Sequence, residues 1–426
     1  MKKTILLSIV YCLISHLTFS QKTILHCGTL MDMASNGSQK EMSVVIEKNK
    51  IVDIQKGYLR AAAGDKTVDL KSKTIMPGLI DMHVHLESQT SKDQFQKRIA
   101  NNMADNAFEA EKYARITMMA GFTTVRDLGG SGANIALRNA INRGTVAGPR
   151  ILTSGRTIAT TGGHGDPSNG LNEDLHVDPN NMTGVINSPD DARKAIRQRY
   201  KDGADWIKIT ATGGVLSIAK NGKGPQFQAD ELEAIIATAK DYGFKVAAHA
   251  HGAEGMKRAL RAGVTTIEHG SLLDDECIAL FKEKGAYLIP TIIAGRTAAD
   301  SAKVPGYYHP FVAAKALEIG TQIQAAFGRA YKAGVKIGFG TDGGVYPHGY
   351  NAKEFEYMVE GGMPMMECLK VATIGNADIL DMKNEIGSIE KGKLADIIAV
   401  DSDPIADPKA MMKVSFVMKD GVIYKQ

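Results

Sequence analysis

Short runs of alternating apolar and polar residues stand near both ends of the chain. They span residues 23–26, 43–47 and 50–54 at one end and 396–400, 414–418 and 422–424 at the other. A two-residue period is typical of half-buried strands, and turn-forming Asn49, Gly57 and Asp420-Gly421 separate neighbouring runs. Because the middle of the chain lacks this pattern, we expect residues 21–77 and 385–426 to pack together as one small β-sandwich.

The middle of the chain, residues 78–384, alternates strand-like runs with amphipathic helical stretches. The predicted strands are residues 78–82, 123–127, 150–154, 206–210, 245–249, 265–268, 286–290 and 336–340. The predicted helical stretches include residues 230–242, 253–262, 275–284 and 310–333. Eight strands, each followed by a helix, predict an α/β fold of the (β/α)₈ TIM-barrel type. The longest loops, residues 156–189 and 211–228, follow the third and fourth strands, on the face where such barrels carry active sites.

The first twenty residues have the three-part form of a secretory signal. Lys2 and Lys3 precede an apolar run over residues 5–14, and Thr18-Phe19-Ser20 follows it. We expect cleavage after Ser20 and an exported protein, periplasmic or secreted. An uncleaved membrane anchor is the alternative, but the run is shorter than the roughly 20 residues that cross a bilayer.

Charge and cysteine content narrow the expected partners. The whole chain carries a formal charge of +4, and loss of Lys2 and Lys3 with the signal lowers it to +2. This balance gives no electrostatic reason to expect nucleic acid or membrane binding, which leaves a small-molecule partner as the expectation. Three cysteines remain, Cys27, Cys277 and Cys368. Their odd number and wide spacing do not make a disulfide framework, and we expect them to be buried apolar residues.

Candidate metal ligands stand at or just past the ends of the predicted strands. His83 and His85 are two residues apart on an extended segment, so both imidazoles point the same way and one cation can bind both. His249 and His269 end two neighbouring strands in the same manner. Since parallel strands of a barrel bring their carboxyl ends together, we expect these four histidines to meet.

Lys208 lies at a strand end among Trp206, Ile207 and Ile209. Burial lowers the pKa of a lysine, and a neutral amine can capture carbon dioxide as a carbamate whose two oxygens bridge two cations. The alternative is a lysine whose stem packs in the core while its ammonium pairs with an acid. The surrounding histidines favour the carbamate, an N6-carboxylysine.

Asp342 follows the eighth predicted strand. A carboxylate there would bind a metal ion and take the proton from an attacking water. The alternative is a turn or cap aspartate before Gly343 and Gly344. Its place at the last strand of the barrel favours the catalytic role.

The segment 77–85, which reads PGLIDMHVH, resembles the opening signature of the amidohydrolase superfamily, and residues 387–396 look similar to its closing segment. Residues 153–157, 161–166, 207–209, 213–214 and 248–252 resemble the imidazolonepropionase-related Xaa-Pro dipeptidases, a prolidase-like group. The resemblance implies a barrel of the metal-dependent hydrolase type, a homo-oligomer and two divalent metal ions. Zn²⁺ is the first expectation, with Mn²⁺ or Co²⁺ able to occupy the same ligands. The implied ligands are His83, His85, Lys208, His249, His269 and Asp342. Lys208 disfavours imidazolonepropionase itself, which resembles a one-metal site.

The expected reaction is hydrolysis of the amide bond of dipeptides or N-acyl amino acids with a free C-terminal carboxylate, as in Xaa-Pro or Xaa-Arg/Lys dipeptidases. A metal-activated water would attack, and Asp342 would carry its proton to the leaving nitrogen. The candidates for binding the substrate carboxylate are His164, His251, Arg156 and Arg296. Surface or salt-bridging roles for the two arginines, and a supporting or solvent-exposed role for His251, stay open. The alternative functions are a cyclic amide hydrolase of the imidazolonepropionase type and a catalytically silent metal- or peptide-binding protein.

Overall fold

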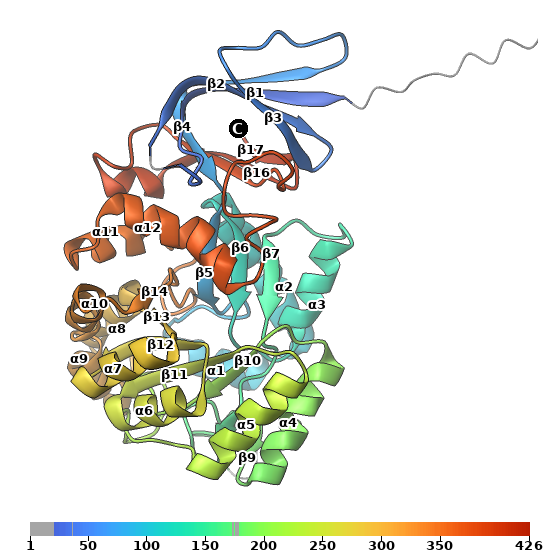
Figure 1. The fold of residues 1–426 in the computed structure, drawn as a ribbon. Coiled ribbons are helices and arrows are strands. Elements are labelled where there is room, and N and C mark those ends of the chain that lie inside the picture. Colours follow the sequence, from blue (N-terminus) through green and yellow to red (C-terminus); the bar gives the residue numbers. More distant parts are fainter. Residues whose placement is uncertain (1–20, 36, 173, 175–178) are drawn as a thin grey trace, which may run out of the picture.

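The computed structural model describes residues 21–35, 37–172, 174 and 179–426, and Figure 1 shows its architecture. A barrel surrounded by helices carries a separate, strand-rich region at one end, where the two ends of the described chain meet. The predicted signal peptide, residues 1–20, lies outside the described residues.

Eight parallel strands form the barrel, as predicted. They are β5 (Leu79–Val84), β6 (Phe122–Asp127), β7 (Arg150–Thr153), β10 (Ile207–Thr210), β11 (Val246–Gly252), β12 (Thr266–Leu272), β13 (Tyr287–Ile289) and β14 (Lys336–Ile337). Two sheets, β5-β6-β7 and β10-β11-β12-β13-β14, are joined at both seams by backbone hydrogen bonds. Asp205 N donates to Thr153 O over 2.7 Å at one seam, and His85 N donates to Gly343 O over 2.6 Å at the other. The barrel is therefore closed.

Helices follow the strands and cover the outside of the barrel (Figure 1). They are α1 (Gln94–Ala100), α2 (Met103–Met119), α3 (Ala133–Asn142), α4 (Pro189–Asp202), α5 (Ala229–Asp241), α6 (Ala253–Ala262), α7 (Asp275–Lys284), α8 (Ile292–Ala302), α9 (Pro310–Ile319), α10 (Ile323–Lys332), α11 (Lys353–Glu360), α12 (Met365–Lys370) and α13 (Asn376–Ile379). A π-helical turn (Val371–Gly375) joins α12 to α13, and a 3₁₀ turn (Pro408–Met412) precedes β16.

Two predicted segments differ in detail from the structure. The single helical stretch expected over residues 310–333 is two helices, α9 and α10, separated at Gly320. Glycine is a poor helix former, and here it allows a close approach, since a Cβ on Gly320 would lie 2.4 Å from the carbonyl oxygen of Gly295. The loop over residues 156–189 contains a short parallel pair, β8 (Ala159–Thr160) and β9 (Val185–Ile186).

The two chain ends form one curled sheet, with strand order β17-β16-β15-β4-β1-β2-β3. The strands are β1 (Lys22–Leu30), β2 (Gln39–Glu47), β3 (Lys50–Lys56), β4 (Lys66–Pro77), β15 (Ile397–Val400), β16 (Val414–Lys419) and β17 (Val422–Lys425). Ile51 N, on edge strand β3, donates to Lys393 O, which lies just before β15. The sheet thus folds over one apolar core shared by both ends, including Leu25, Val44, Ile397 and Phe416. The predicted association of the termini is confirmed.

Arg150 joins this curled sheet to the barrel. Its guanidinium lies 2.5 Å from Asp396 Oδ2 and 2.6 Å from Asp420 Oδ1. The three cysteines Cys27, Cys277 and Cys368 are buried and unpaired, as expected. Within the described part of the chain, no helix combines the length and apolar character needed to cross a membrane.

Candidate active site

One cavity at the carboxyl ends of the barrel strands, here called the central cavity, collects the predicted ligands. Its volume is about 240 Å³. Its lining includes all six predicted metal ligands, His83, His85, Lys208, His249, His269 and Asp342. The strand ends that the sequence pointed to therefore meet in space.

His83, His85, Lys208 and Asp342 make the first cluster of this cavity. His83 Nε2 lies 3.3 Å from His85 Nε2 and 3.4 Å from Asp342 Oδ1. Asp342 Oδ1 is 3.3 Å from His85 Nε2, and Lys208 Nζ is 3.4 Å from His83 Nε2. His83 Nε2 thus has three other nitrogen or oxygen atoms within 3.4 Å.

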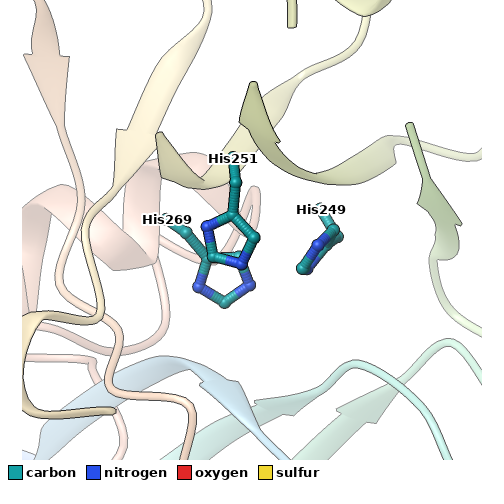
Figure 2. A group of neighbouring side chains, drawn as sticks. All are labelled: His249, His251 and His269. Atoms are coloured by element: carbon teal, nitrogen blue, oxygen red, sulfur yellow. The ribbon is translucent and has the colours of Figure 1, made fainter. Parts of the chain in front are cut away.

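His249, His251 and His269 make the second cluster. Figure 2 shows their imidazoles gathered in one space, the first two from β11 and the third from β12. Their ligand nitrogens lie within 4.8 Å of one another, and His269 also belongs to a group with His83 and Asp342. The two clusters are therefore contiguous. His251, predicted to contact substrate, stands close enough to the ligands to join them.

Each histidine of the two clusters contacts a neighbouring polar group through one of its ring nitrogens. The pairs are His83 Nδ1 with Glu268 Oε2 at 2.9 Å, His85 Nδ1 with Gly129 O at 3.1 Å, His249 Nε2 with Gly213 O at 3.2 Å, His251 Nδ1 with Ser271 Oγ at 2.9 Å and His269 Nδ1 with Thr291 Oγ1 at 2.7 Å. Histidines that bind metal ions are normally held in this way, because the bond fixes the ring and its tautomer. The donors present therefore fit divalent cations.

Backbone conformation at the site is unusual. His269, Thr291 and Asp342 have φ values of 71°, 52° and 56°, in the left-handed region that residues other than glycine seldom adopt. Such conformations cost about 1–3 kcal/mol each and concentrate at functional sites. Two of these residues, His269 and Asp342, are predicted ligands. The third, Thr291, carries the hydroxyl that contacts His269.

The electrostatics favour the protonation states that bind cations at most of these ligands. Burial, and then the nearby Lys208, lowers the pKa of His83 to about 4. Burial lowers the pKa of Lys208 itself to about 8. Burial alone would raise the pKa of Asp342, but His83, His85 and Lys208 outweigh it and hold this pKa below its usual value. Burial lowers the pKa values of His83, His249, His251 and His269, so these imidazoles are neutral near neutral pH, and the aspartate is ionised. Burial would lower the pKa of His85 too, but its hydrogen bond to Asp342 and the charge of that carboxylate raise it above the usual value.

Glu268 is a functional residue that sequence reasoning missed. Its carboxylate contacts His83 Nδ1 on one side and, over 2.9 Å, Arg126 Nη2 on the other. Burial would raise the pKa of Glu268, but Arg126 and His83 lower it to about 2. The available signal was an acidic residue buried within a predicted strand, directly before His269.

Asp81 stands in the same sequence fragment as His83 but is not among the residues that line the cavity. Its carboxylate accepts hydrogen bonds from the backbone N–H groups of His83 and Thr341 and from the Asn351 side chain. It therefore joins the end of the first barrel strand to the end of the last. This contact helps to bring His83 and Asp342 together.

The four predicted carboxylate-binding residues divide into two pairs. His164 and His251 line the central cavity, and the His164 ring stacks on His249 with centroids 4.3 Å apart. Arg156 and Arg296 are not among the residues that line it. The Arg296 guanidinium lies 2.6 Å from Glu360 and stacks over Tyr357, because it projects from α8 toward α11. The structure brings the two histidines to the site and not the two arginines.

Comparison with known proteins agrees with this geometry. The Amidohydrolase family model matches residues 74–424. Ochratoxinase of Aspergillus niger is 30% identical over 430 residues, covering 95% of this chain and 86% of that protein.

Two solved structures are also similar. A Xaa-Pro dipeptidase with methionine bound in its active site has a TM-score of 0.93 and 49% identity, over 95% of this chain and 100% of that one. A prolidase complexed with N-methylphosphonate-L-proline has a TM-score of 0.86 and 30% identity, over the same shares. The chain therefore belongs to the amidohydrolase family, whose members are generally metal-dependent hydrolases acting on C–N bonds.

Proposed function

We propose that this protein is a binuclear metal-dependent amidohydrolase that cleaves dipeptides or N-acyl amino acids with a free C-terminal carboxylate. The observation that carries the proposal is the meeting of five histidines, Lys208 and Asp342 in one cavity, with every imidazole held through its other nitrogen. The likeness to a Xaa-Pro dipeptidase and a prolidase supports the substrate class.

Two divalent cations, with Zn²⁺ the best match to the donors, would be held by His83, His85, Lys208, His249, His269 and Asp342. When bound, they would lower the pKa of a water molecule toward neutrality and polarise the substrate carbonyl. Lys208 would serve as an N6-carboxylysine shared by both ions. Its burial and its 3.4 Å distance from His83 Nε2 support this role.

Asp342 is the proposed proton carrier. Its carboxylate is held ionised beside His85, so it can accept a proton from the attacking water and deliver it to the leaving nitrogen. His164 and His251 border the space left for the substrate and are the proposed contacts of its carboxylate.

The test is a substrate panel assayed on purified protein after metal removal and again after addition of Zn²⁺. Xaa-Pro, Xaa-Arg and N-acyl amino acids should be hydrolysed only with metal, and elemental analysis should find about two ions per chain. Turnover of cyclic amides alone would instead favour an imidazolonepropionase-like enzyme. Metal binding without turnover of any amide would indicate a silent binding protein.

We also propose that the protein is exported and assembles as a homo-oligomer. Residues 1–20 support export through their basic start, apolar centre and small final residue. N-terminal sequencing of protein from the cell envelope or medium should begin at Gln21. Light scattering during size-exclusion chromatography measures the assembly.

A further inference from the structure

A second cavity, here called the side cavity, lies beside the central cavity. Its volume is about 560 Å³. It is lined by helix α1 and the loop before it, by the loops after β7 and β10, and by the loop between α8 and α9 together with the start of α9. Its apolar and aromatic lining residues are Phe95, Leu216, Ile218, Tyr307, Tyr308 and Val312.

The two cavities share a wall. Gln94 and Leu216 line both of them. The central cavity, at about 240 Å³, is smaller than the roughly 300–1,000 Å³ typical of ligand sites. A substrate with a bulky group would therefore extend beyond the central cavity, and the side cavity is the adjoining space at this wall.

Lys315, on α9, fixes the loop that forms this wall. Its ammonium donates to the carbonyl oxygens of Gly214, Ser217 and Ala219 over 2.7, 2.7 and 2.8 Å. A lysine has three N–H donors, so all of them are used on one short loop. Lys315 is only 4% exposed. Burying such a charge is costly unless it is hydrogen-bonded, and these contacts hold residues 214–219, Leu216 among them, in one position.

Arg98, one of the two lysine or arginine residues that line the side cavity, is also engaged. Arg98 donates to the backbone oxygens of Asn169, over 3.2 Å, and Pro167. Its guanidinium therefore anchors the loop after β7. Lys92, the other such residue, is exposed to solvent. The six apolar and aromatic side chains give a bulky apolar group a surface to contact.

We infer that the side cavity is a substrate subsite for a bulky apolar or aromatic group of the amide substrate, and that Lys315 is the positioning residue for its shared wall. This inference rests on the proposed amidase function. It narrows the substrate class to amides that carry such a group away from the bond that is cleaved.

The experiment compares short and extended substrates that share one scissile amide. N-acetyl and N-(2-naphthoyl) forms of the best-cleaved amino acid vary the acyl side. N-acetyl-alanine and N-acetyl-naphthylalanine vary the other side. We expect kcat/KM of at least one naphthyl substrate to exceed that of its short partner by about tenfold, as for apolar groups in a fitted pocket.

Three variants test the position of the subsite. In Phe95→Asp and Ile218→Asp the ratio of kcat/KM between extended and short substrates should fall to about one, because a carboxylate would replace an apolar wall. Phe95 is 42% exposed, so this variant is expected to fold. Lys315→Met should raise KM for the extended substrate more than for the short one. The control is Phe108→Asp, which alters an aromatic residue 79% exposed on α2 that lines neither cavity and should keep the wild-type ratio.

Two results would overturn the inference, and they differ from each other. Equal kcat/KM for short and extended substrates, or an unchanged ratio in both Phe95→Asp and Ile218→Asp, removes the subsite while leaving the amidase. No hydrolysis of any panel member by metal-loaded protein removes the amidase function, and the subsite with it.

Discussion

His83 Nδ1 lies 2.9 Å from Glu268 Oε2, and both side chains are buried inside the barrel. The carboxylate fixes the imidazole so that Nε2 faces the central cavity. Glu268 thus orients a proposed ligand that is 185 residues away in the sequence.

Glu268→Gln should weaken metal binding. Loss of the carboxylate behind a ligating histidine typically lowers metal affinity about 10- to 100-fold, because the ring becomes less basic and less well oriented. Competition with a chromophoric Zn²⁺ chelator measures the change. Glu233→Gln, at an exposed position of α5, is the control and should bind as the wild type does. Wild-type affinity in Glu268→Gln would contradict the orienting role.

Arg126→Met should destabilise the metal-free protein. The Arg126–Glu268 ion pair is fully buried, and removal of one partner leaves an uncompensated charge. Breaking such a pair costs about 3–5 kcal/mol of unfolding free energy. Urea unfolding measures this loss. Arg115→Met, which removes an exposed ion pair on α2, should change stability by less than about 1 kcal/mol.

Lys208→Ala should lose both bound metal and activity. If the side chain supplies a bridging carbamate, short carboxylates such as acetate or propionate should restore part of both. Elemental analysis and a peptidase assay with increasing carboxylate concentrations follow the rescue. Full activity of Lys208→Ala without added carboxylate would exclude the bridging role.

Asp342→Asn should keep the fold and lose turnover. An amide cannot accept the proton from the attacking water, so we expect kcat to fall by at least about 100-fold. Circular dichroism and the thermal midpoint should stay close to wild type. Asp300→Asn, at an exposed position of α8, provides the matched control. A near-normal rate in Asp342→Asn would remove this residue from the mechanism.

His348→Gln should reduce the loss of stability in acid. Burial lowers the pKa of His348 to about 4, and the side chain bonds Ser88 O and stacks on Tyr113. Between pH 6.5 and 4 the unfolded chain therefore binds a proton that the folded chain does not, and stability falls as pH decreases through this window. The slope of unfolding free energy against pH should be shallower in the variant, by up to the contribution of about one proton bound on unfolding. Equal slopes in variant and wild type would contradict the prediction.

Much of the fold and of the central cavity was predictable from sequence, because their determinants are local. Apolar runs with turn signals marked all eight barrel strands, and period-two runs marked six of the seven strands of the curled sheet, all but β4. Parallel strands bring their carboxyl ends to one face, so His83, His249 and Asp342 could be expected to meet without knowledge of the loops. The spacing of His83 and His85 similarly set their common direction.

Only the tertiary structure decided the contacts that depend on how separate elements pack. Periodicity did not reveal that Glu268 reaches across the barrel to His83, or that Arg296 turns away to Glu360. The break at Gly320 follows from the close approach of two helices. Lys315 and the side cavity likewise depend on the path of an irregular loop. Strand ends are determined by local pattern and a common topology, whereas side-chain partners and loop walls are determined by packing between segments far apart in the sequence.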